Sequence, residues 1–308
     1  MRRKIIVGTR GSKLALIQAE SVVARIREIA PYLEITISKI VTKGDSNRHI
    51  QLDRMDSIGI FVKEMEEALL GGQIDLAVHS LKDMPTQIPE GLYLVAVIER
   101  LDFRDVLVSR GAKLSELAPG SRIGTGSLRR AVQLGACCPD LEVCSIRGNV
   151  DTRLRKVAEG EFDGVITAAA AMKRLGWQER ISEYLPLEHF LPAVGQGALA
   201  VEARLDDKEV AELLAPLNHR PTWQSITAER AFLEALGGGC RAPIAALGTV
   251  KDGMLKLEGM VASVGTKKIM RASIEDSTIA SEELGVRLAQ KLLAMGADEF
   301  IDEVRVIG

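Results

Sequence analysis

A regular alternation of strand-like and helix-like segments in the first hundred residues constrains the fold more than any other feature of this sequence. Strand patterns occur at 5–7, 33–41 and 74–78, and helix patterns occupy 12–29 and 61–70 between them. The order strand, helix, strand, helix, strand predicts a mainly parallel sheet covered by its helices. Ligands of such sheets bind beyond the carboxyl ends of the strands, so functional side chains are expected in the loops there.

The same alternation repeats after residue 102. Strands are expected at 122–124, 141–146 and 164–167, and helices at 128–137, 150–158 and 168–175. Two similar units in tandem predict two doubly wound lobes of the kind seen in periplasmic binding proteins, with a cleft between them.

The pattern changes after Pro221. A helix is expected at 222–236, three strands at 244–250, 254–264 and 268–274, and a closing helix at 280–294. Gly253 and Gly265 fall at the hairpin turns, and strands that follow one another directly predict an antiparallel sheet. We therefore expect an α/β fold with lobe 1 at 1–99 and 198–217, lobe 2 at 100–197, and a smaller α+β domain with a three-stranded antiparallel sheet at 218–308.

Charge and composition exclude several classes of protein. The 40 basic and 42 acidic residues nearly cancel, so an anion site must come from local arrangement, and 4% aromatic residues argue against a nucleic-acid binder. No run is apolar enough to span a membrane, and residues 5–7 are too few for the core of a signal peptide. Four cysteines and four histidines lack metal-ligand spacing. We expect a cytoplasmic protein with reduced thiols and no metal, membrane or nucleic-acid partner.

Arginines follow several of the expected strands. Arg129 and Arg130 come after Ser127 at a helix start, where they oppose the helix dipole unless they bind carboxylates as forked donors. Arg147 and Arg10 occupy equivalent positions after other strands. Each of these motifs alone is also compatible with an exposed helix or a structural turn, but their repetition in both lobes favours an acidic ligand.

The segment 78–85 is the candidate catalytic turn. It follows the strand at 74–78 and places Lys82 and Asp83 where that strand ends, with Asp83 as an ionised carboxylate able to stabilise a developing cation. A Lys-Asp surface turn is the alternative. His79 is interpreted as a hydrogen-bonded structural group.

Cys240 stands in the run Gly237-Gly238-Gly239-Cys240-Arg241, where three glycines allow an adaptable, exposed loop. This thiol is the predicted attachment point for an acidic group. Cys137, Cys138 and Cys144 are interpreted as small hydrophobic residues. The polar segment 43–58 is long for a connection and predicts a mobile lid or loop tip.

Seven strings carry a resemblance to a known family. They are GTR at 8–10, FVKE at 61–64, AVHSLKD at 77–83, GTGSLRR at 124–130, RGNV at 147–150, PAVGQGA at 192–198 and GGCRAP at 238–243. By their number and order, the chain resembles the porphobilinogen deaminases, also called hydroxymethylbilane synthases, over essentially its whole length.

The resemblance implies a monomeric transferase of tetrapyrrole and haem biosynthesis. Such an enzyme carries a dipyrromethane cofactor on Cys240 through a thioether, adds four porphobilinogen units head to tail with loss of ammonia, and releases hydroxymethylbilane with water. Asp83 and Lys82 would be catalytic. The cofactor would be held by Lys82, Asp83, Thr125, Ser127, Arg129, Arg130, Arg147 and Arg153, and the substrate by Arg10, Ser12, Phe61, Arg147, Arg153, Arg174 and Gln196.

The lid segment departs from the family pattern. The family usually has Gly-Gly-Lys-Gly before the phenylalanine of the lid helix, whereas here Asp56-Ser57-Ile58-Gly59 precedes Ile60 and Phe61. The lysine charge is absent, and Arg54 can replace it in part.

A second interpretation stays open on the residues alone. Two tandem lobes with a cleft also suit an anion-binding protein without catalysis. That interpretation leaves Cys240 and the third domain without a role.

Overall fold

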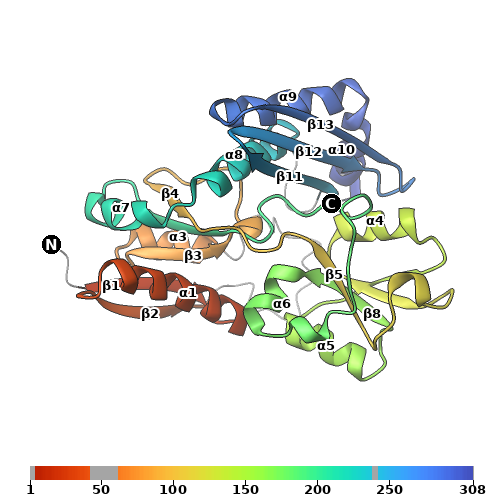
Figure 1. The fold of residues 1–308 in the computed structure, drawn as a ribbon, viewed down its shortest axis with the longest axis horizontal. Coiled ribbons are helices and arrows are strands. Elements are labelled where there is room, and N and C mark those ends of the chain that lie inside the picture. The colour runs from red at the N-terminus through yellow and green to blue at the C-terminus, as the bar shows by residue number, and fades with distance from the viewer. Residues whose placement is uncertain (1–3, 42–61, 238–241, 308) are drawn as a thin grey trace. The chain divides into compact units, whose positions relative to one another are not determined.

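The computed structural model describes residues 4–41, 62–237 and 242–307 (Figure 1). These residues form two compact units, one of Met1–Arg100 with Ala198–Trp223 and the other of Leu101–Gly197 with Gln224–Gly308. The sequence predicts three domains, the last two of which fall almost entirely within the second unit. The division into three domains stays a prediction.

The first unit is built on a five-stranded sheet. Its strands are β1 (Lys4–Arg10), β2 (Glu34–Ile40), β3 (Leu76–Ser80), β4 (Leu92–Val97) and β10 (Leu199–Arg204), in the order β2-β1-β3-β10-β4. β1 runs parallel to β2 and β3, as predicted, whereas β10 runs antiparallel to both of its neighbours. The sequence pattern did not reveal β10 or β4, because both depend on pairing with distant parts of the chain.

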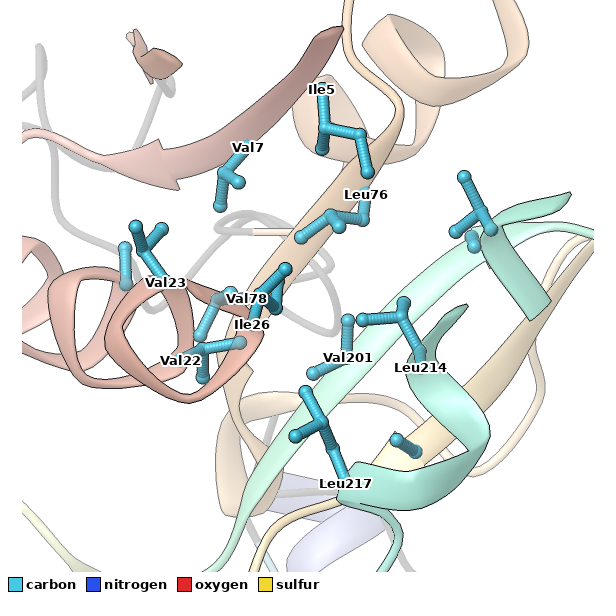
Figure 2. Packing of buried hydrophobic residues seen from close by; sticks show 14 of the residues in the cluster. Ile5, Val7, Val22, Val23, Ile26, Leu76, Val78, Val201, Leu214 and Leu217 are labelled. Carbon is cyan, nitrogen blue, oxygen red and sulfur yellow. The ribbon is translucent and has the colours of Figure 1, made fainter. Parts of the chain in front are cut away.

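Helices cover both faces of this sheet. α1 (Lys13–Ile29) and α7 (Lys208–Leu214) share one apolar cluster with the sheet, in which Leu76 and Val78 of β3 point toward Val22 and Ile26 of α1 (Figure 2). α3 (Lys63–Leu70) packs against Ala77 of the same strand. Successive strand residues point to opposite faces, so α1 and α3 lie on opposite sides of β3.

One local expectation about β1 is wrong. The first strand was expected at 5–7 only, but β1 continues to Arg10 and pairs with β2 as far as Ile40. Gly8 serves close packing instead, since the side chain of Ile74 occupies the space that a Cβ would need. Ser12, at the start of the predicted helix, caps α1, and its hydroxyl accepts a hydrogen bond from the Ala15 N–H at 3.2 Å.

The second unit repeats this topology. Its first sheet has the order β7-β6-β8-β5-β9, with strands β5 (Asp105–Ser109), β6 (Arg122–Thr125), β7 (Glu142–Ser145), β8 (Gly164–Ala168) and β9 (Glu183–Tyr184). The helices are α4 (Leu128–Cys137), α5 (Val150–Ala158) and α6 (Ala169–Leu175), all close to their predicted bounds. In both sheets the first strand of the parallel set lies between the second and the third. The predicted pair of doubly wound sheets is therefore confirmed.

The C-terminal part forms the predicted antiparallel sheet of β11 (Ile244–Lys251), β12 (Met254–Ala262) and β13 (Ile269–Ser277). Gly253 lies in the first hairpin turn with φ 77°, next to Asp252 with φ 51°. Three helices pack on this sheet, α8 (Arg220–Ala235), α9 (Ser281–Ala294) and α10 (Ala297–Ile307), of which α10 was not predicted (Figure 1).

A shared core explains why the second α/β sheet and the C-terminal sheet form one unit. Val132 of α4 and Leu191 pack in one cluster with Ala245, Leu247 and Met260 of the antiparallel sheet. Apolar area buried in common ties the two parts together.

Candidate active site

In the first unit, the predicted catalytic residues lie directly after β3. The strand ends at Ser80, and Leu81–Asp83 form a single 3₁₀ turn. The N–H of Leu81 donates to the carbonyl of Ala198 at 3.2 Å, which joins this turn to the start of β10. Lys82 is half-buried and Asp83 is exposed, so the carboxylate is accessible to a ligand.

Two polar pairs hold the end of β3 in place. Ser80 and Gln18 of α1 exchange hydrogen bonds, at 2.8 Å from the amide nitrogen and 3.1 Å to the amide oxygen. Nε2 of His79 lies 2.9 Å from Oε2 of Glu202 on β10, and both side chains are buried. The interpretation of His79 as a structural group is confirmed, and the backbone that leads into the catalytic turn is firmly anchored.

Arg10 and Ser12 lie at the same edge of the sheet as the catalytic turn. β1 and β3 are parallel neighbours, so their carboxyl ends meet at one edge. Arg10 is half-buried at the end of β1, and Ser12 begins α1. The first unit thus gathers Arg10, Ser12, Lys82 and Asp83.

In the second unit, Arg129 and Arg130 bind a carboxylate of the chain itself. Nη1 of Arg129 donates to Oδ2 of Asp105 at 2.7 Å and to the carbonyl of Leu191 at 2.6 Å. Arg130 donates to Oδ1 of Asp105 from Nε at 3.0 Å and from Nη2 at 2.7 Å. All three side chains are buried. The forked recognition expected from the sequence is therefore engaged by an internal partner, and a role of these two arginines toward the cofactor stays a prediction.

The positive charges of Arg129 and Arg130 keep the buried Asp105 carboxylate ionised. Burial alone would raise the pKa of Asp105, but the two guanidinium groups outweigh burial and hold that pKa well below its usual range. Burial lowers the pKa of Arg129, and the charge of Asp105 opposes that effect. Sequence reasoning missed Asp105, because the strand that carries it was not recognised and its contacts span more than twenty residues.

Gln196 completes the cluster. Its side-chain amide donates to Oδ1 of Asp105 and to the carbonyl of Phe103, both at 2.8 Å, and accepts from Nη2 of Arg130 at 3.2 Å. The residue is fully buried. These contacts give Gln196 a structural position, and its predicted contact with substrate stays a prediction.

Arg153 and Arg174 are different, because no described acidic side chain pairs with either of them. Nε of Arg153 donates to the carbonyl of Gly148, and Nη2 of Arg174 donates to the carbonyl of Gly197, both at 2.8 Å. Burial, followed by the charge of Arg130, lowers the pKa of Arg153, and burial lowers the pKa of Arg174 to about 10. A half-buried cation without a carboxylate costs free energy and favours binding of an anion.

The remaining predicted residues of this unit follow β6 and β7. Thr125 is buried at the end of β6, and its hydroxyl accepts the N–H of Ser127 at 3.2 Å. Gly126 lies between these two residues in sequence. A Cβ atom added at Gly126 would lie 3.8 Å from Nη2 of Arg153, so the guanidinium group is close to this glycine. Arg147 is exposed after β7. The second unit thus gathers Thr125, Ser127, Arg147 and Arg153 at the carboxyl ends of β6 and β7.

Two predicted residues and the predicted lid lie outside the described residues. They are Cys240, Phe61 and the segment 43–58. α8 ends at Ala235, and the described chain continues to Gly237. Gly237 has a φ of 63°, and its N–H donates to the carbonyl of Glu234 at 2.8 Å. The other three cysteines, Cys137, Cys138 and Cys144, are free and half-buried, and burial raises the pKa of Cys137 to about 12. No described helix is long and apolar enough to cross a membrane.

Fold and site together define an α/β protein that places arginines and one exposed aspartate at the carboxyl ends of two doubly wound sheets. Residues 5–212 match the family model described as "Porphobilinogen deaminase, dipyromethane cofactor binding domain". Residues 223–294 match "Porphobilinogen deaminase, C-terminal domain". The chain belongs to the porphobilinogen deaminase family.

Curated relatives agree with this assignment. The porphobilinogen deaminase of Pelobacter propionicus is 48% identical over 98% of this chain and 97% of the relative. The porphobilinogen deaminase of Geobacter metallireducens is 47% identical over 98% of this chain and 95% of the relative. That of Desulforudis audaxviator is 47% identical over 99% of both chains.

The likeness to one solved structure is far weaker. A putative methionine-binding lipoprotein of Bacillus subtilis is 12% identical, with a TM-score of 0.42 over 70% of this chain and 88% of that one. A likeness of this strength says nothing about ligands, and the fold is established by the strand order and pairing given above.

Proposed function

We infer that this chain is a porphobilinogen deaminase, a transferase that builds hydroxymethylbilane for tetrapyrrole and haem biosynthesis. It joins four porphobilinogen molecules head to tail onto a dipyrromethane cofactor, each with loss of ammonia, and water then releases the product. The observation that carries this inference is the match of residues 5–212 and 223–294 to the two domains of this family.

The charges of the described residues suit the cofactor and the substrate. Every pyrrole unit brings an acetate and a propionate, so a growing chain needs several cations along its path. Arg153 and Arg174 are half-buried without a described acidic partner, and Arg147 is exposed nearby in sequence. We propose that these three arginines bind pyrrole carboxylates, with Thr125 and Ser127 beside them, and that Arg129 and Arg130 contribute positive charge from behind.

In the first unit, Asp83 has the exposure that catalysis requires. When bound, the dipyrromethane supplies the pyrrole carbon to which the next unit is joined. The Asp83 carboxylate stabilises the positive charge that develops on porphobilinogen as ammonia leaves. Lys82, Arg10 and Ser12 orient the carboxylates of the incoming substrate. The family resemblance also assigns substrate contact to Phe61, through its apolar ring, and to Gln196 of the second unit.

We propose that Cys240 carries the cofactor through a thioether. The glycine run begins at the described end of α8, where Gly237 already adopts a positive φ. We also propose a monomer, as the family resemblance implies, and a cytoplasmic enzyme, which the free state of the three described cysteines supports.

Intact-mass spectrometry tests this function directly. The purified protein should carry the mass of two linked pyrrole units, and limited porphobilinogen should add a ladder of further units. Cys240→Ser should lack both, whereas Cys144→Ser should behave as the wild type. An unmodified wild-type mass without a ladder would support the anion-binding protein without catalysis.

Arg174→Met tests the proposed carboxylate site. We expect the KM for porphobilinogen to rise about tenfold, because a charge-assisted hydrogen bond is lost. The melting temperature should change little, because removal of a half-buried charge that has no described acidic partner offsets the lost hydrogen bond to the carbonyl of Gly197. The matched control is Arg155→Met, which removes an exposed arginine on α5. A lower melting temperature with unchanged KM would make Arg174 a structural residue.

A further inference from the structure

Three ionisable side chains lie in the apolar layer between α3 and the first sheet. Alternation along β3 puts His79 on the same face as Ala77, which packs against α3. On β10, Ala200 pairs with His79 and Glu202 pairs with Ala77, so Glu202 shares that face. Glu66 belongs to the buried side of α3. The three residues are at most 9% exposed.

The contacts within this group leave two carboxyl oxygens without partners. Nε2 of His79 lies 2.9 Å from Oε2 of Glu202. Oε1 of Glu202 and Oε1 of Glu66 are buried and have no hydrogen-bond partner among the described residues. Buried polar atoms are rarely left unsatisfied, so these two oxygens need an explanation.

A proton on Glu66 accounts for this arrangement. Two ionised carboxylates would place like charges in an apolar layer, which is costly. If Glu66 is protonated, one of these two like charges is removed. A neutral Glu66 also brings a hydroxyl donor into this layer, and burial followed by the charge of Glu202 favours that neutral form.

This group lies immediately before the catalytic turn. His79 precedes Ser80, which is the last residue of β3, and the turn of Lys82 and Asp83 follows. We propose that Glu66, His79 and Glu202 form a buried triad that shares a proton and positions the turn carrying Asp83, with Glu66 in its neutral form. The three are positioning residues, and their catalytic consequence rests on the function proposed above.

Other charged groups face the same layer. β10 also supplies Arg204, which donates to the carbonyls of Leu69 and Ile74 and is paired with Asp75 and Asp207. β1 supplies Arg10 at its end, and β4 supplies the apolar Leu92. Burial, followed by the charge of Glu202, raises the pKa of Glu66 to about 7, while His79 lowers it and exposed Glu67 raises it.

The direction of the pH effect follows from this shift. Between the ordinary pKa of 4.5 and about 7, Glu66 is protonated in the folded protein and ionised in the unfolded chain. The folded state therefore loses stability as the pH rises through that window, and the loss is complete above it. Ionised Glu66 repels Glu202 and disturbs the packing of α3 on β3.

Glu66→Gln tests the triad, because glutamine keeps the shape and the donor but cannot ionise. The variant should match the wild type near pH 4.5 and melt about 5 °C higher at pH 8. The ratio of its kcat to the wild-type kcat should rise about tenfold from pH 6.5 to pH 8.5, with a constant ratio of KM values. The infrared C=O stretch of a protonated carboxyl group should be present in the wild type at pH 6 and absent from the variant.

The control is Glu20→Gln, which neutralises an exposed glutamate of α1 and should change none of these readouts. Absence of the infrared band, or identical kcat profiles for Glu66→Gln and the wild type, would overturn the proposal. A protein with the band and the melting shift but no turnover of porphobilinogen would contradict the proposed function and the catalytic part of this proposal, and would leave the shared proton standing.

Discussion

Asp83→Asn should lower kcat for porphobilinogen by about 10²- to 10³-fold, the range expected when one preorganised electrostatic contact to the transition state is lost. Asparagine keeps the size of the side chain and its place in the 3₁₀ turn after β3. It cannot stabilise a cation, because the amide carries no charge. KM should change little, since the proposed role of Asp83 concerns the charge that develops during loss of ammonia rather than substrate binding.

The exposure of Asp83 makes this experiment easy to interpret. An exposed carboxylate contributes little to folding, so the variant should melt at the wild-type temperature. Glu90→Gln, which neutralises another exposed acid of the same unit, is the matched control and should keep full activity. A kcat within about threefold of the wild type would remove Asp83 from the mechanism, since that corresponds to less than about 1 kcal/mol.

Sequence patterns predicted the elements that are specified locally. α4 begins after Ser127, whose hydroxyl accepts the N–H of Arg130 at 3.5 Å, and both its ends agree with the predicted range. α5 also agrees at both ends. The antiparallel sheet was recognisable because its hairpins are short and one of them turns at Gly253. Helix periodicity, caps and tight turns all act within a few residues of sequence.

Elements that depend on distant partners were missed. β10 joins the first sheet through pairing with β3, more than a hundred residues away. Glu202 therefore could not be recognised as a partner of His79, and Glu66 had the appearance of an ordinary helix residue. The sequence favoured carboxylate recognition by Arg129 and Arg130, which is what the structure contains, but the partner is Asp105 on an unrecognised strand.

The candidate residues could be placed at one edge of each sheet because they follow apolar strand patterns in the sequence. Lys82 and Asp83 follow β3, Arg10 ends β1, and Arg147 follows β7. In each case the chain leaves an apolar run and enters a polar segment at the edge where parallel strands end. The burial of Arg129 and Arg130 could not be predicted from the sequence in the same way. An arginine that binds a ligand and an arginine that binds an internal aspartate can have the same local sequence.

Asp105→Ala should destabilise the protein by about 3–5 kcal/mol, the cost of removing one partner from a buried ion pair. The substitution leaves the buried guanidinium groups of Arg129 and Arg130 without a counter-charge and removes an acceptor from the amide of Gln196. Since α4 shares its core with the C-terminal sheet, the loss should affect the whole second unit. Denaturant unfolding measures the change in the free energy of unfolding.

Two further variants separate charge from general damage. Glu159→Ala removes the acid of an exposed pair with Arg155 on α5 and should leave the unfolding midpoint nearly unchanged. Adding Arg129→Met and Arg130→Met to Asp105→Ala should recover part of the stability, because the uncompensated charges are then gone. A midpoint for Asp105→Ala close to that of Glu159→Ala would mean that water or another group compensates the two arginines.

The pH dependence of the same cluster provides an independent measurement. The pKa of Asp105 is lowered in the folded protein, so its contribution to stability is present above the ordinary aspartate pKa of 3.8 and is lost only as the pH falls toward the lowered value. The difference in stability between the wild type and Asp105→Ala should therefore be constant from pH 5 to pH 8 and shrink only in strong acid. Glu66 acts in the opposite direction within the other unit, since its raised pKa makes the wild type lose stability between pH 4.5 and about 7. A difference for Asp105→Ala that shrank between pH 5 and pH 8 would contradict the assignment of an ionised Asp105 between two guanidinium groups.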